Sequence, residues 1–219
     1  EAGVAWPVIN CDPLVLPTSI DYETDLWETL IEFTEIWPGE WTLIGGQMVF
    51  LHGLENRSLP PHVSMDLDVL VNARVVSRGV RDFARALEQR EFELDGISPE
   101  GLAHRYRRRD ITVDVLAPDG LGLRTDLTTT PPGRTLQVPG GTQALQRTEL
   151  VPVVIGTMTG LVPRPSLLGA IISKAGAVEV ADAPNAQRED LAFLLSLVDN
   201  PQAMRGELTK RDRKRLVAR

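Results

Sequence analysis

The stretch SMDLDVLV, residues 64–71, is rich in aliphatic residues and predicts a β-strand. Neighbouring side chains of a strand point to opposite faces, so Ser64, Asp66 and Asp68 share one face. Two carboxylates on one face repel each other, and this costs stability unless a cation or basic groups offset the charge. Mg²⁺ takes hard oxygen ligands and is typically held by one or two carboxylates together with substrate phosphates.

A second stretch, ITVDVL over residues 111–116, repeats this pattern and predicts another strand. Asp114 shares a face with Thr112, whereas the apolar residues share the other face. If the two strands are neighbours, three carboxylates converge. Three acids on one face can hold two metal ions that clamp the attacking and leaving oxygens of a phosphoryl transfer. The third acid can also take the proton of an attacking hydroxyl.

Gly45 and Gly46 follow a short predicted strand at residues 41–44 and open a short predicted helix. Glycines let the backbone approach phosphate oxygens closely, and the start of a helix offers free N–H groups. No Lys-Ser or Lys-Thr follows, so the pair is not a Walker A loop. The alternative is a purely structural turn.

Further elements complete an α+β (mixed α/β) fold, in which a mixed sheet is flanked by helices. The expected helices cover residues 22–37, 74–90, 167–180 and 185–198, with a last basic helix from Pro201, and the expected strands cover 102–107 and one or two segments of 150–162. We predict an extended N-terminal arm (1–20), a core (21–163) and a helical C-terminal segment packed on the core (164–219).

The composition is that of a folded protein. Of 219 residues, 42% are hydrophobic and 24% are charged, which excludes wholesale disorder. Cys11 is the single cysteine, so no internal disulfide forms. No apolar run approaches the roughly 18 residues that span a bilayer, and no signal pattern is present. We therefore expect a cytoplasmic location and no membrane partner.

The charge is uneven along the chain. The formal net charge is −7, yet the segment from residue 210 to the end is rich in Lys and Arg. The acidic body argues against a broad coating by nucleic acid, although a local basic patch could hold one acceptor. The alternative is a solvated terminal helix that frays.

The order of these motifs resembles the DNA polymerase β-like nucleotidyltransferase superfamily. More narrowly, the chain is similar to AbiEii-like nucleotidyltransferases, which are toxins of type IV-style toxin–antitoxin systems. The similar stretches are LIGGQ (43–47), SMDLD (64–68), TVDV (112–115), RPSLL (164–168) and REDL (188–191). The resemblance covers roughly residues 40–200.

This resemblance implies a polymerase β-like core and metal-dependent transfer of a nucleotide from an NTP to an acceptor hydroxyl. The implied ion is Mg²⁺, with Mn²⁺ as a substitute, the leading acceptor is RNA such as tRNA, and a toxin of this kind has a cognate antitoxin. The implied catalytic residues are Asp66, Asp68, Asp114, Lys174 and Asp190, of which the first three bind metal. The implied nucleotide-binding residues are Gly45, Gly46, Ser64, Lys174 and Arg188. Relatives often carry Arg at the position of His62, so one basic contact with the triphosphate is in doubt.

Lys174 can also be interpreted from its own helix, where Leu167, Ile171 and Val178 recur with it at helical spacing. A buried ammonium requires an anion, either a phosphate or a carboxylate. Asp190 lies in a similar stripe of the next predicted helix, so a structural Lys174–Asp190 pair is the alternative to a role in phosphate binding.

Four arginines at positions 105, 107, 108 and 109 form another basic cluster. They could grip an RNA backbone, with Tyr106 as a stacking surface, or they could be the solvated edge of a sheet. Two other functions remain open. One is an inactive nucleotide-binding or interaction module on the same scaffold, which His62 favours. The other is a nucleotidyltransferase acting on a small molecule such as an antibiotic, which the acidic body favours.

Overall fold

The computed structural model describes residues 6–18, 21–62, 64, 66–178 and 184–217. The strands are β1 (Leu14–Val15), β2 (Trp41–Ile44), β3 (Asp66–Val71), β4 (Glu93–Leu94), β5 (Arg105–Arg108), β6 (Ile111–Pro118), β7 (Gln137–Val138), β8 (Thr148–Ile155) and β9 (Met158–Pro165). The helices are α1 (Asp21–Ile36), α2 (Gly45–Glu55), α3 (Gly79–Glu88), α4 (Gly141–Gln146), α5 (Leu167–Ala177), α6 (Pro184–Ser196), α7 (Pro201–Gly206) and α8 (Lys210–Val217).

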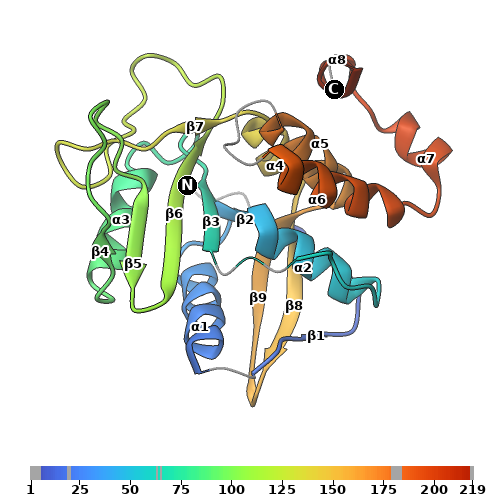
Figure 1. The fold of residues 1–219 in the computed structure, drawn as a ribbon, viewed down its shortest axis with the longest axis horizontal. Helices are drawn as coiled ribbons and strands as arrows, with labels where there is room; N and C mark the ends of the chain where they lie inside the picture. Colours follow the sequence, from blue (N-terminus) through green and yellow to red (C-terminus); the bar gives the residue numbers. More distant parts are fainter. Residues whose placement is uncertain (1–5, 19–20, 63, 65, 179–183, 218–219) are drawn as a thin grey trace.

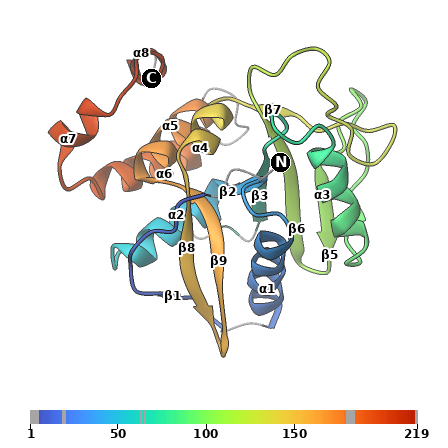
Figure 2. The same cartoon turned by 180° about the vertical axis from the view of Figure 1, so that it is seen from behind.

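Two sheets organise these elements (Figure 1). In the six-stranded sheet the order is β2-β3-β6-β5-β4, with β7 also paired to β6. Its β3 and β6 are parallel, whereas β2, β5 and β4 pair in antiparallel fashion with their neighbours. The second sheet has the order β1-β8-β9, and its β8 and β9 form a long antiparallel ribbon that extends past α1 in both views (Figure 2). The prediction of an α+β fold with a mixed sheet flanked by helices is confirmed.

Helices cover both faces of the six-stranded sheet. Leu67 and Val69 of β3 pack into the core that includes residues of α1 and α3. Leu70 of β3 and Leu116 of β6 pack on the other face with residues of α4 and α5. Because both faces are covered, β6 is buried along its whole length.

The second face also carries the aspartates of β3. They lie near the amino end of the strand, on the side that faces the C-terminal helices, which lie together in both views (Figures 1 and 2).

A buried cluster fixes α2 against β9. The side chain of Arg164 is fully buried, and its guanidinium contacts Glu55 and His52 of α2 and lies 3.4 Å from a carboxylate oxygen of Glu149. The other ring nitrogen of His52 hydrogen-bonds with the carbonyl of Pro165 at 3.0 Å. The two carboxylates offset the cost of burying the guanidinium. This cluster holds the helix that begins with Gly45 and Gly46.

Most predicted elements form within a few residues of their predicted bounds, and the exceptions have local causes. The helix predicted over 74–90 begins only at Gly79, because the carbonyl of Asn72 accepts from the N–H groups of Val75 and Val76 in a turn. The predicted last helix is two helices. Thr209 and Asp212 exchange backbone-to-side-chain hydrogen bonds of 2.9 and 3.1 Å, a capping box that starts α8 anew.

Two further predictions concern the chain as a whole. The domain boundary predicted at residues 163 and 164 lies within β9, and the division into domains stays a prediction. No helix in the described part of the chain is both long enough and apolar enough to cross a membrane.

Candidate active site

The register of β3 and β6 brings two predicted site residues together. The strands are parallel neighbours, as predicted, and Asp68 lies directly opposite Asp114, whereas Asp66 lies opposite Thr112. Residues opposite each other on parallel strands present their side chains on the same face. Asp66, Asp68 and Asp114 therefore share one face of the sheet.

The charge of Asp68 is not balanced by its surroundings. Burial raises the pKa of Asp68 to about 7, and the carboxylates of Asp114 and Asp66 contribute to the rise. The ammonium of Lys174 and the guanidinium of Arg105 act in the opposite direction without restoring the usual value. A carboxylate held in this way favours a proton or a cation.

Asp114 has a partner within the protein. Its two carboxylate oxygens accept hydrogen bonds from Nε and Nη2 of Arg105, at 2.8 and 2.7 Å, and its side chain is buried. These bonds raise the pKa of Arg105. Arg105 therefore binds a carboxylate of the site and is not free for the RNA contact predicted for it. The sequence contains the signal for this partner. A two-residue turn at residues 109–110 pairs Arg108 with Ile111, and three positions further along the two antiparallel strands Arg105 lies opposite Asp114.

Gly45 and Gly46 make room for side chains of the site. A Cβ atom on Gly45 would lie 1.7 Å from Oδ2 of Asp68, and φ at Gly45 is +73°, which favours glycine. A Cβ atom on Gly46 would lie 2.5 Å from Cβ of Ser64. The glycines therefore let Asp68 and Ser64 contact the start of α2, a role that the sequence reasoning missed.

Lys174 lies in a small pocket beside Asp68. The pocket has a volume of about 140 Å³, and its walls include Gly45, Asp68, Ser173, Lys174 and Gln187. Nζ of Lys174 donates to Oδ2 of Asp190 at 2.6 Å and to Oε1 of Gln187 at 3.0 Å. The ammonium has three donors, so these two bonds leave one hydrogen for a ligand in the pocket. The sequence reasoning missed Ser173 and Gln187, which carry no motif.

His62 approaches α6, the helix that carries Asp190. Its Nε2 lies 3.2 Å from Oδ1 of Asp190, and its Nδ1 lies 3.6 Å from a carboxylate oxygen of Glu189. Asp190 is therefore positioned between Lys174 and His62. The imidazole therefore contacts the carboxylate partner of Lys174.

Other predicted residues lie apart from this pocket. Arg188 is exposed, and its Nη1 donates to Oδ1 of Asn185 at 3.2 Å on the same helix. Arg107 and Arg108 pair with Asp95 and Asp25.

The prediction that Tyr106 could stack on a base is wrong. Its ring is fully buried, and its hydroxyl hydrogen-bonds with Thr130 at 2.9 Å. Alternation along β5 directs this ring into the core when Arg105 and Arg107 face outward.

The donor set suits a divalent cation at Asp66 and Asp68. Both offer carboxylate oxygens, and the raised pKa of Asp68 marks a negative charge that lacks a partner. Each carboxylate oxygen of Asp114 already accepts one hydrogen bond from Arg105, so a cation would have to use the remaining lone pairs or displace Arg105. Accordingly, no group of three metal-binding side chains is preassembled among the residues the structure describes. The metal-binding role of Asp66, Asp68 and Asp114 stays a prediction.

Comparison with known proteins gives similarity to solved structures and none to known sequences. No protein-family profile matches this chain, and no curated protein sequence matches it. A solved structure that matches is the crystal structure of an antigenic nucleotidyltransferase-like protein from Paracoccidioides brasiliensis. The similarity has a TM-score of 0.48 at 13% sequence identity and covers 89% of this chain and 85% of that chain. The function is therefore inferred from the residues of this chain itself.

Proposed function

We propose that this protein is a metal-dependent nucleotidyltransferase that moves a nucleotide from an NTP to an acceptor hydroxyl. One observation carries the proposal: Asp68 lies opposite Asp114 and lines a pocket with Lys174. Carboxylates that suit a cation and an acceptor proton therefore adjoin an ammonium that suits a phosphate.

Each residue has a stated role in this proposal. Asp66 and Asp68 would hold Mg²⁺ or Mn²⁺, which when bound neutralises and orients phosphate oxygens. Lys174 would donate its remaining N–H to a phosphate oxygen, and Asp190 would position Lys174. The backbone of Gly45 and Gly46 and the hydroxyl of Ser64 would hold the rest of the triphosphate. Arg188 is exposed and would reach only a part of the nucleotide that extends beyond the pocket.

In the proposed reaction the acceptor oxygen attacks the α-phosphorus. The bond from that phosphorus to the oxygen bridging the β-phosphate breaks, and pyrophosphate leaves with the electron pair. Asp114, once Arg105 has released it, would accept the proton of the acceptor hydroxyl. Positioning and charge neutralisation supply most of the rate enhancement in reactions of this kind.

For the acceptor we propose RNA, such as tRNA, and for the cellular role a cytoplasmic toxin with a cognate antitoxin. Both rest on the sequence resemblance of the three aspartates, the two glycines and the Lys174–Asp190 pair.

A second candidate function is an inactive nucleotide-binding module. The observation that favours it is the bidentate pair of Arg105 with Asp114, which occupies both oxygens of the third acid. In such a module the pocket would bind nucleotide, but no group would accept the proton of an acceptor.

Transfer of label from each α-labelled NTP to total RNA, with Mg²⁺ or with EDTA, separates these functions. We expect Mg²⁺-dependent labelling that falls by roughly a hundredfold or more in Asp68→Asn and Asp114→Asn. Asp95→Asn, which changes an exposed carboxylate, is the matched control and should label normally. Nucleotide binding without labelling of RNA or of small acceptors would favour the inactive module, and neither binding nor labelling would overturn both.

A further inference from the structure

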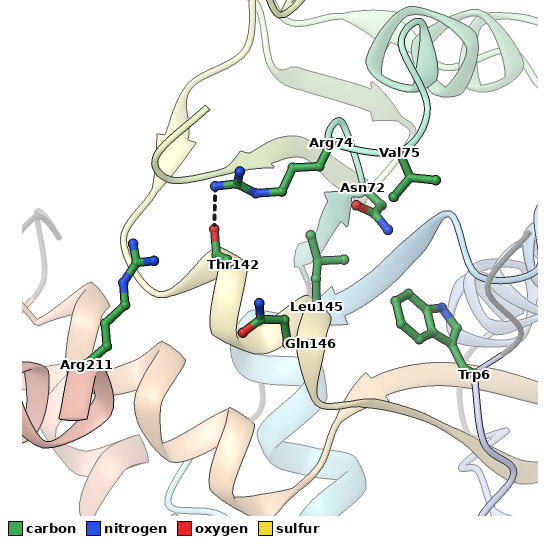
Figure 3. A pocket seen from close by; sticks show the side chains of 8 residues that line it. All are labelled: Trp6, Asn72, Arg74, Val75, Thr142, Leu145, Gln146 and Arg211. Atoms are coloured by element: carbon green, nitrogen blue, oxygen red, sulfur yellow. Dashed lines mark hydrogen bonds between the residues drawn. The ribbon is translucent and has the colours of Figure 1, made fainter. Parts of the chain in front are cut away.

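Two adjoining pockets lie beyond the carboxyl end of β3, away from the candidate active site. The first has a volume of about 470 Å³ and is bounded by the N-terminal arm, the β3–α3 loop, α4 and α8 (Figure 3). The second has a volume of about 460 Å³ and shares the walls Arg74 and Val75 with the first. Each is large enough for a group of nucleotide size.

Four arginines line these pockets: Arg74 and Arg211 in the first, and Arg78 and Arg124 with Arg74 in the second. We call this region the arginine surface. All four side chains belong to exposed residues. They come from the β3–α3 loop, the loop after β6 and α8, so the fold, and no sequence motif, brings them together.

The positive charge of the arginine surface is not balanced by the protein. Nη2 of Arg74 donates only to neutral acceptors, which are the carbonyls of Asp119 and Gly120 at 2.9 and 2.8 Å and the Thr142 hydroxyl at 3.1 Å.

The other three arginines are not held in ion pairs, although Arg78 is near enough to Asp126 to help lower the pKa of that carboxyl. Within the described residues, Arg78, Arg124 and Arg211 take part in no ion pair or side-chain hydrogen bond. The one carboxylate of the described chain that lines either pocket, Asp126, pairs with Arg81 at 3.0 Å. In a chain of net charge −7, this concentration of unpaired cations marks a surface that suits an anionic ligand.

The first pocket also offers a flat apolar surface. Figure 3 shows the indole of Trp6 across the pocket from the guanidinium groups of Arg74 and Arg211, with Leu145 and Gln146 between them. The side-chain amides of Asn72 and Gln146 add hydrogen-bonding groups. Cations for phosphates, an aromatic face for a base and amides for base edges are the groups with which proteins hold single strands.

We propose that the arginine surface, together with Trp6, binds a single-stranded polynucleotide. An acidic peptide would satisfy the arginines but would bring no base to the indole, and a paired duplex keeps its base faces stacked inside. Asn72 directly follows the end of β3 and lies four residues after Asp68, a separation of about 13 Å along an extended chain. A strand held here therefore reaches the candidate active site within a few nucleotides. Binding of the strand stands independently, and only its role as acceptor rests on the proposed function.

Fluorescence anisotropy of labelled RNA and DNA strands of about twelve nucleotides tests this proposal. We expect the double variant Arg78→Glu/Arg124→Glu to bind both strands roughly tenfold or more weakly. The salt dependence, as log Kd against log salt concentration, should become shallower by about 0.7 for each phosphate that the variant no longer neutralises. The matched control Arg57→Glu/Arg85→Glu makes the same change of net charge at exposed arginines outside both pockets, and we expect it to bind within roughly twofold of the native protein.

Trp6→Phe gives a second readout, because a base that stacks on Trp6 quenches the native fluorescence and this part of the quenching should be absent in the variant. The proposal would be overturned if the Arg78→Glu/Arg124→Glu variant bound strands as the native protein does, or if the control lost as much affinity as this variant. It would also be overturned if polyglutamate of equal charge displaced the strand. Strand binding that depends on these arginines in a protein that transfers no label would support it while the proposed function fails. Normal labelling of RNA, together with strand binding that does not depend on these arginines, would overturn the binding proposal while the proposed function stands.

Discussion

At residue 68 the protein carries a carboxyl group whose ionisation opposes folding. Its pKa is about 7 in the folded chain and near 3.8 in the unfolded chain. Between these values the folded chain binds more protons than the unfolded chain. The contribution of Asp68 to stability therefore falls as the pH rises from about 4 through about 7.

Asp68→Asn should remove this pH dependence. One pKa unit corresponds to about 1.4 kcal/mol, and because Asp68 keeps partial access to solvent we expect about 2 kcal/mol of added stability for the variant near pH 8. Near pH 4 the two proteins should differ little. Urea unfolding in EDTA at both pH values measures the difference, and a native protein more stable than the variant near pH 8 would contradict the proposed charge imbalance.

The buried pair of Lys174 and Asp190 gives a second prediction at this scale. Both side chains are almost fully buried, so removing one partner leaves an uncompensated charge. Asp190→Leu should lower the free energy of unfolding by about 3 kcal/mol, whereas Lys174→Met/Asp190→Leu should recover much of that loss.

A double-mutant cycle by urea unfolding measures this coupling. Additive effects of the two substitutions would show that the ion pair does not stabilise the fold. The double variant should also lose nucleotide transfer although it regains much of its stability, since the proposed phosphate contact is gone.

At the scale of elements, the junction between β2 and α2 depends on glycine. A positive φ costs a residue other than glycine roughly 1–2 kcal/mol. Gly45→Ala should destabilise the protein by more than this, because the new Cβ would also displace the carboxylate of Asp68. Gly96→Ala is the matched control, since Gly96 has φ of +86° and open space around its Cα. Thermal unfolding of the two variants separates strain from steric overlap. Equal losses would mean that Asp68 moves aside freely.

Much of the central sheet could be predicted from alternation and turn chemistry. Apolar residues between Asp66 and Asp68 and around Asp114 fix which face the acids occupy, and the same alternation buries Tyr106. The two-residue turn at 109–110 fixes the partner of Arg105. The start of α8 was also present in the sequence as the Thr209–Asp212 capping box, but the basic residues around it drew attention to charge and the box was missed.

At the scale of the molecule, long-range side-chain contacts were beyond the sequence. The approach of Lys174 to Asp68, the fully buried Arg164 and the pockets between Trp6 and Arg211 depend on how separate elements pack. Local periodicity predicts that a side chain is buried but not which distant residue it meets. The sequence therefore predicts which acids form the candidate site, but it predicts only part of how the side chains of the site are arranged in space.

The basic C-terminal segment is tied to the core, which differs from the expectation of a fraying helix. Asp212 is fully buried and accepts from Arg147 at 2.7 Å, and Arg215 of α8 pairs with Asp119. Asp212→Ala removes both the helix cap and the ion pair. Amide exchange should accelerate across residues 210–217 and remain slow in β3 and β6.

Hydrogen-exchange mass spectrometry measures this change, with Asp199→Ala on an exposed loop as the control. Faster exchange throughout the sheet would show instead that α8 is part of the global folding unit. Because Arg211 belongs to α8, the same variant should also weaken the binding of single strands.

The proposed reaction requires that Asp66 and Asp68 hold a divalent cation beside a bound nucleotide. Equilibrium dialysis near pH 8, with Mn²⁺ and an NTP on both sides of the membrane, measures the cation that the protein retains. We expect retained Mn²⁺ for the native protein and for Asp95→Asn, and a loss of it for Asp68→Asn. If Asp68→Asn retains as much Mn²⁺ as the native protein, or if the native protein retains none, Asp68 does not hold a divalent cation.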